Sequence, residues 1–151
     1  MRKAMLLLAV FRLAGTLWAA DPFVGTWNLS VARSTKGSRV FKSWIVKIEA
    51  LDDTFKWTSD VVDFDGKPKH LEWAGKYDEK DYLLKGSSEF DASAVKRIDA
   101  KTIEWIDKKA GKEAMTWQFT VSKDGKTQSW TGKIKDAKGQ EIKHPQVFEK
   151  Q

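Results

Sequence analysis

The chain has 151 residues, of which 27 are lysine or arginine and 21 are aspartate or glutamate, so its formal net charge is +6. It contains no cysteine, which excludes disulfide bonds, thiol nucleophiles, thiolate metal sites and a lipoprotein anchor. Its length suits one domain with one core, for which eight tryptophans and eight phenylalanines supply large side chains.

The first twenty residues have the layout of a secretory signal peptide. A positive start (MRK) and an apolar segment (AMLLLAVF) are followed by Ala19-Ala20 and then by the helix-breaking Asp21-Pro22. Arg12, near the middle, makes the segment a poor membrane span. We therefore expect cleavage after Ala20 and export to the periplasm or the extracellular space.

Removal of this leader, residues 1–20, changes the charge of the protein. Three of the 27 basic residues (Arg2, Lys3 and Arg12) and no acidic residue lie in it, so residues 21–151 carry 24 basic against 21 acidic side chains, a net charge of +3. Such a small excess, spread over alternating strands, makes no stripe that follows a phosphate backbone. We expect residues 21–151 to form a single domain without a nucleic-acid partner or a membrane span.

Turn-forming clusters recur along residues 21–151 and separate short runs rich in Trp, Val, Ile, Thr and Phe. In AMTWQFTVS, the apolar Met115, Trp117, Phe119 and Val121 alternate with polar residues, which is the two-residue period of a strand with one dry face. The whole pattern predicts no long helix and about ten strands, at residues 25–32, 42–51, 54–64, 67–77, 81–85, 93–98, 102–109, 113–122, 126–135 and 142–149.

The third of these runs contains an irregularity. Phe55 and Trp57 share one face, but after Val61 the apolar residues are Val62 and Phe64, which stand on the other face. A β-bulge would explain this change of face.

Successive antiparallel strands leave two exposed edges unless the sheet closes on itself. The predicted fold class is therefore all-β, a roughly ten-stranded antiparallel up-and-down β-barrel, with a β-sandwich as the alternative. A barrel of about ten strands can enclose a cavity, whereas one of about eight can be filled by its own side chains. An outer-membrane barrel is disfavoured because Lys, Asp and Glu interrupt the apolar band that lipid requires.

The first expected strand, in DPFVGTWNLS, carries a Gly-x-Trp at Gly25 and Trp27, and the chain ends in PQVFEKQ. This combination resembles the calycin superfamily of lipocalins and fatty-acid-binding proteins, in which a Gly-x-Trp in the first strand closes one barrel end. Residues 21–151 are also similar to small exported bacterial proteins of that type, with the segments DPFxGTW, KRID, KDGKT and DAKGQ. The resemblance implies that Trp27 belongs to the core.

Two features depart from the fatty-acid-binding pattern. That branch has two helices after its first strand, but residues 31–42 (VARSTKGSRVFK) form a Ser/Gly/basic loop. It also holds the ligand carboxylate with an Arg-x-Tyr in its last strand, where this chain has Gln146 and Phe148. The resemblance therefore implies a less specific apolar or amphipathic ligand.

Dry faces that point inward would line a binding cavity, which typically combines apolar walls with a few polar groups. Arg97 is the polar candidate, because a guanidinium can hold an acidic head group; the alternative is that it pairs with a neighbouring carboxylate or faces solvent. The apolar candidates would serve equally well in a packed core. The expected ligand-binding residues are Trp44, Val46, Phe55, Trp57, Leu71, Trp73, Arg97, Trp105, Met115, Trp117 and Phe119.

The sequence contains no catalytic or metal-binding signature. His70 and His144 are the two histidines; neither belongs to a Ser/His/Asp set or a His-x-x-x-His spacing, and His144, before Pro145, is expected at the surface. We therefore predict a non-catalytic protein, without cofactor or metal, that binds a small hydrophobic or amphipathic molecule. The alternatives are a filled barrel acting through its surface and a carbohydrate-binding domain, in which Trp130 is the indole expected to be exposed.

Overall fold

The protein is described by a computed structural model that covers residues 20–34, 41–135 and 138–151. The expected signal peptide lies almost wholly outside these residues. Within them, no helix is long and apolar enough to cross a membrane.

The described chain is all-β. It has ten strands, whose positions agree closely with those expected from the alternation: β1 (Gly25–Leu29), β2 (Ser43–Leu51), β3 (Thr54–Val62), β4 (Pro68–Gly75), β5 (Asp78–Lys85), β6 (Ala92–Asp99), β7 (Thr102–Lys109), β8 (Lys112–Val121), β9 (Thr127–Lys135) and β10 (Glu141–Lys150). The first strand is shorter than expected because the carbonyl of Ser30 accepts hydrogen bonds from the backbone N–H of Ser34 (3.0 Å) and from its hydroxyl (2.8 Å), which turns the chain.

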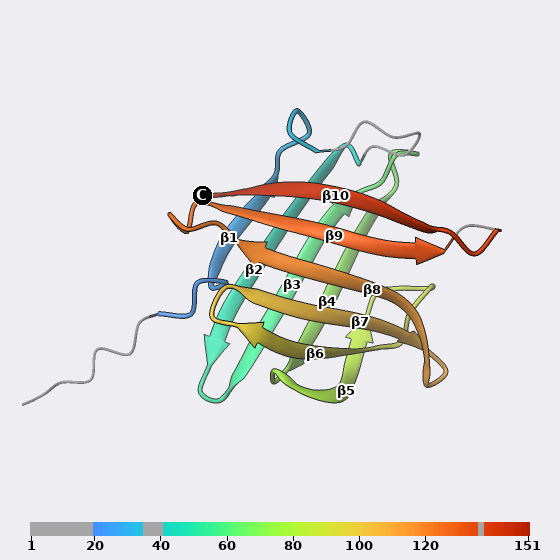
Figure 1. Cartoon of the computed structure of the whole chain (residues 1–151), viewed down its shortest axis with the longest axis horizontal. Coiled ribbons are helices and arrows are strands. Elements are labelled where there is room, and N and C mark those ends of the chain that lie inside the picture. Colours follow the sequence, from blue (N-terminus) through green and yellow to red (C-terminus); the bar gives the residue numbers. More distant parts are fainter. Residues whose placement is uncertain (1–19, 35–40, 136–137) are drawn as a thin grey trace, which may run out of the picture.

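Each strand pairs antiparallel with the next along the chain, and β1 pairs with β10, so the sheet closes into a barrel. Trp27 of β1 faces Val46 of β2 on one side and Lys150 of β10 on the other. In Figure 1, β1–β4 and β7–β10 form two layers whose strands cross at a steep angle. The predicted up-and-down barrel is confirmed, and the β-sandwich is excluded.

The core lies inside the barrel, on the faces that the alternation identified. In β2, Trp44, Val46 and Ile48 are buried, whereas Ile45 between them is 44% exposed. In β8, Phe119 and Val121 are buried on the same parity as Met115 and Trp117.

The predicted bulge after Val61 is wrong. Strands β2 and β3 pair without a register shift from Ser43↔Val62 to Leu51↔Thr54. The inward positions of this segment are taken by small or charged residues, so Ser59 and Asp63 are buried on the same parity as Val61. Hydrogen bonds stabilise both residues: Ser59 Oγ accepts from Trp44 Nε1 (2.6 Å), and the Asp63 carboxylate accepts from backbone N–H groups of the following turn.

One end of the barrel is closed by residues next to the start of β1. Trp27 is fully buried, as the resemblance implied, and its indole N–H donates to the carbonyl of Phe23 (2.9 Å). The Lys150 ammonium lies 5.1 Å from the centre of the same ring. Glycine is favoured at position 25 because its φ is +140°, a backbone conformation that residues with a Cβ rarely adopt.

Candidate functional site

The barrel encloses a cavity of about 630 Å³. The cavity extends to the barrel end opposite Trp27, where the turn between β3 and β4 and the turn between β5 and β6 contribute Phe64 and residues 86–90 to its lining. Its size is within the range of small-molecule binding sites. We treat this cavity as the candidate functional site.

A nearly continuous series of aromatic rings forms the wall. Phe119 stacks on Trp130 with ring centroids 4.1 Å apart, and Trp105 lies 5.8 Å from Phe119 and 5.1 Å from Trp57. At the other side, Trp44 meets Trp130 edge-on at 5.2 Å. Stacked and edge-to-face pairs of this kind are the favoured arrangements of aromatic rings and stabilise the wall.

Seven of the eleven residues expected from the sequence line this cavity. They come from β2, β3, β4, β7 and β8, and they are Trp44, Trp57, Leu71, Trp105, Met115, Trp117 and Phe119.

Four of the expected residues lie outside the lining. Val46 is fully buried in the core, and Trp73 is buried against Trp105, with ring centroids 4.9 Å apart. Phe55 stacks on Tyr77 at 4.3 Å. Arg97, the fourth, is described next.

Arg97 belongs to the closed end of the barrel rather than to the cavity wall. Its guanidinium forms an ion pair with Asp21 and lies 4.3 Å from the centre of the Tyr77 ring. The alternative expectation, pairing with a neighbouring carboxylate, is therefore the one that the structure supports. Burial raises the pKa of Tyr77, and the nearby Asp21 carboxylate raises it further.

The most unusual residue of the wall, Asp107 of β7, was missed by the sequence reasoning. It lines the cavity and is only 5% exposed. Its Oδ1 accepts hydrogen bonds from Ser93 Oγ (2.7 Å) and Trp105 Nε1 (2.7 Å), and its Oδ2 accepts one from Trp117 Nε1 (3.1 Å). Burial raises the pKa of Asp107, and the three hydrogen bonds oppose that rise.

The register of the sheet explains this placement. Asp107 lies opposite Ser93 of β6 and Met115 of β8. Two residues earlier in β7, on the same inward face, Trp105 lies opposite Trp117 of β8. The signal was present in the sequence, because Asp107 has the same parity as Ile103 and Trp105. The parity that Asp107 shares with these two residues therefore indicates the dry face of the strand.

One indole of the wall has no hydrogen-bond partner. Among the described residues, the N–H groups of Trp27, Trp44, Trp73, Trp105, Trp117 and Trp130 each donate to an oxygen. Trp57 Nε1 is buried and has no acceptor within that part of the chain. Since Trp57 lines the cavity, its N–H is a donor that a bound molecule could satisfy.

The other charged side chains of the lining are near the turns. Asp63 accepts backbone N–H bonds from Asp65 (3.0 Å) and Lys67 (2.9 Å), and chiefly the Lys67 bond holds the pKa of Asp63 below its usual value. Lys69 Nζ lies 3.8 Å from Asp63 Oδ2, and Glu89 belongs to the turn after β5.

The prediction that Trp130 is exposed is wrong, since the residue is 1% exposed. Its polar neighbours Ser129 and Thr131 belong to the outer face, and the inward neighbour Gln128 accepts the indole N–H through Oε1 (2.8 Å). The polar neighbours of Trp130 therefore indicate a strand with one polar and one buried face, and they do not indicate an exposed indole.

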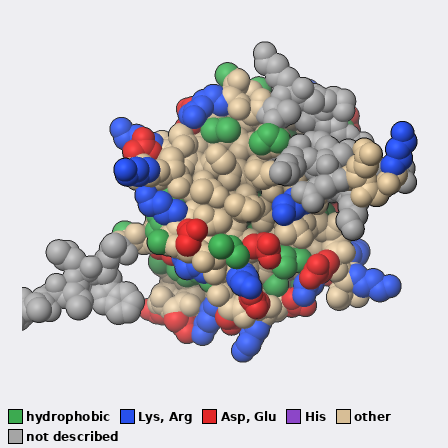
Figure 2. Space-filling model, viewed as in Figure 1, with side chains coloured by type: hydrophobic (Ala, Val, Ile, Leu, Met, Phe, Trp, Pro, Cys, Tyr) green, Lys and Arg blue, Asp and Glu red, His purple; other side chains and the backbone are tan. Residues whose placement is uncertain are grey.

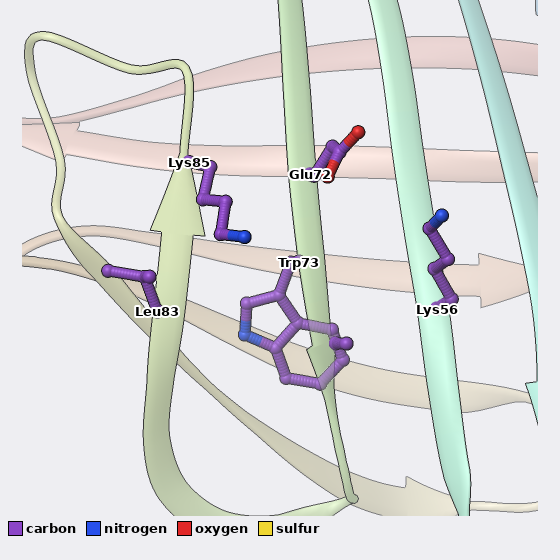
Figure 3. Close-up of a pocket in the computed structure, with 6 residues that line it drawn as sticks. Lys56, Glu72, Trp73, Leu83 and Lys85 are labelled. Carbon is purple, nitrogen blue, oxygen red and sulfur yellow. The ribbon is translucent and has the colours of Figure 1, made fainter.

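A second, smaller hollow of about 160 Å³ lies on the outside of the barrel. It lies along the boundary between β4 and β5, where the two strands pair only at Glu72↔Lys85 and Trp73↔Leu84. Figure 3 shows Lys85 extending from β5 toward β4, whereas Glu72 lies on the side of β4 that faces β3 and Lys56. The hollow is a shallow surface groove and offers no enclosed apolar volume.

Among the described residues, the outer surface carries no cluster of side chains that could bind a metal. His70 is exposed, and its ring nitrogens lie within hydrogen-bond distance of the carboxylates of Asp60 (2.6 Å) and Glu72 (3.2 Å), which accept from the protonated ring and raise the pKa of His70. The side chain of His144 lies outside the described part of the structure. No set of three or more His, Asp or Glu is placed to hold a metal within that part. On the face shown in Figure 2, acidic and basic side chains are intermixed.

No protein-family model matches the chain, and no curated protein matches it. The resemblance to the calycin superfamily therefore stays a prediction.

Proposed function

We propose that this barrel binds a small apolar or amphipathic molecule non-covalently in its interior. The observation that carries the proposal is the cavity of about 630 Å³ walled by indole and phenyl rings. Transfer of an apolar ligand from water into such a site is favourable by about 0.8 kcal/mol for each buried methylene. An alkyl ligand should therefore bind roughly four times more tightly for each added methylene until the cavity is full.

The two alternative functions have less support. Carbohydrate binding needs solvent-facing rings, but six of the seven described tryptophans are buried and the seventh, Trp117, is partly buried. A barrel that acts only through its surface would be expected to have a filled interior.

The experiment is a titration of the purified protein, followed by tryptophan fluorescence, with fatty acids, retinoids, haem and a series of neutral 1-alkanols of increasing length. We expect saturable binding that strengthens with alkanol length. No saturable change with any of these probes would refute the proposal.

Two adjacent leucines provide a matched pair of variants that locates the site. Leu84 is 5% exposed and lines the cavity, whereas Leu83 is 63% exposed and lies on the outer groove. Leu84→Phe should weaken alkanol binding several-fold because the added ring occupies cavity volume. Leu83→Phe should leave it unchanged, and the opposite result would place binding in the outer groove.

A further inference from the structure

The cavity contains one ionisable group deep in its wall, the Asp107 carboxylate described above. All the donors that the described residues give it are neutral: one hydroxyl and two indole N–H groups. A carboxylate accepts about four hydrogen bonds, two at each oxygen. Because Oδ1 already accepts two and Oδ2 accepts one, Oδ2 keeps room for a further donor.

No basic side chain among the described residues pairs with Asp107. None of the ion pairs formed among the described residues includes it. Lys69, the basic residue in the described part of the cavity lining, has its Nζ 3.8 Å from Asp63 Oδ2. A buried carboxylate without a cation is unfavourable, and a cation placed beside it would remove that penalty.

The remaining lining favours a cation as well. Of the lining residues that the structure describes, Asp63, Glu89 and Asp107 are acidic and Lys69 is basic. Acidic groups near a cavity entrance attract cations and repel anions. Aromatic rings form much of the cavity lining, and a cation is attracted to the face of such a ring.

From these contacts we propose that the ligand carries a cationic nitrogen, an ammonium group on an apolar body, and that the Asp107 carboxylate is its counter-ion. The ammonium donates to Asp107 Oδ2, and the apolar body lies along the ring wall. An oxygen on the same ligand would find a donor in Trp57 Nε1, which has no partner among the described residues. This inference rests on the proposed function, because it names the ligand class for the same cavity.

The test compares three probes with one chain length and different heads: decylammonium, 1-decanol and decanoate. Each is titrated below its aggregation concentration into the purified protein at pH 7, with tryptophan fluorescence and calorimetry as readouts. We expect decylammonium to bind at least tenfold more tightly than 1-decanol, and decanoate to bind most weakly.

Two variants assign the preference to Asp107. Asp107→Asn should reduce the ratio of decylammonium to decanol affinity at least fivefold, whereas Glu89→Gln, at another lining carboxylate, should keep that ratio within twofold. If Asp107→Asn does not fold, the three-probe comparison on the unchanged protein decides. Equal affinity for decanol and decylammonium, or a preference that survives in Asp107→Asn, overturns the inference and leaves the proposed function standing. Absence of binding by all three probes overturns both.

Discussion

The pH dependence of stability tests the environment of Asp107. Its pKa is raised in the folded protein, mainly by burial, so between the unfolded value of about 3.9 and the folded value the native state holds more protons than the unfolded state. Stability therefore decreases as pH rises through this window. The contribution is fully present below the unfolded pKa and is lost once pH exceeds the folded pKa.

Asp107→Asn removes this contribution. Across the window, the stability of the original protein minus that of the variant should fall by up to about 1.4 kcal/mol per pH unit, the maximum slope for one proton. At the acid end, the residual difference should be about 1 kcal/mol, because the amide replaces a protonated acid of the same shape but cannot reproduce all three hydrogen bonds. Urea unfolding at half-unit steps from pH 4 to pH 8 measures the difference.

Asp63→Asn is the control, because the pKa of Asp63 is lowered in the folded protein, chiefly by its bond from the Lys67 N–H. Its contribution to stability is present above the unfolded pKa and is lost as pH falls through the folded pKa. The corresponding difference should thus stay constant from pH 5 upward and shrink below about pH 4. A difference for Asp107→Asn that is flat or rises with pH would refute our account of the buried carboxylate.

Three further predictions concern other parts of the barrel. Trp27→Ala should cost about 3–5 kcal/mol in urea unfolding, because it removes a fully buried ring at the closed end; a cost below 1 kcal/mol would show that this end is not packed as described. Gly132→Ala should cost about 1–3 kcal/mol by the same measurement, since a Cβ there would come within 2.6 Å of the Trp117 ring; an unchanged stability would contradict that close approach. By NMR titration, His70 should have a pKa above its usual value that falls in Asp60→Asn, because Asp60 is the largest cause of the rise; no change in the variant would assign the rise to another group.

The strand layout could be predicted because its cause is local. A strand alternates its side chains between two faces whatever its neighbours are, so the run around Trp117 and Phe119 indicates a strand and its buried side at once. Where side-chain polarity and this period disagree, the period holds. Trp130 has polar neighbours and is nevertheless buried, and the apolar Val62 and Phe64 follow Val61 without a bulge between β2 and β3.

By itself, then, the sequence determined the ten strands, their dry faces and a closed antiparallel barrel, since these follow from a period of two and from the need to satisfy sheet edges. Only the tertiary structure decided which inward residues surround open space. Trp73 and Trp105 are both inward and aromatic, yet only Trp105 lines the cavity, because the crossing of the two layers and the pairing register set the depth of each side chain. The same long-range pairing brings Ser93 and the indoles of Trp105 and Trp117 onto the Asp107 carboxylate, a contact that no local pattern encodes.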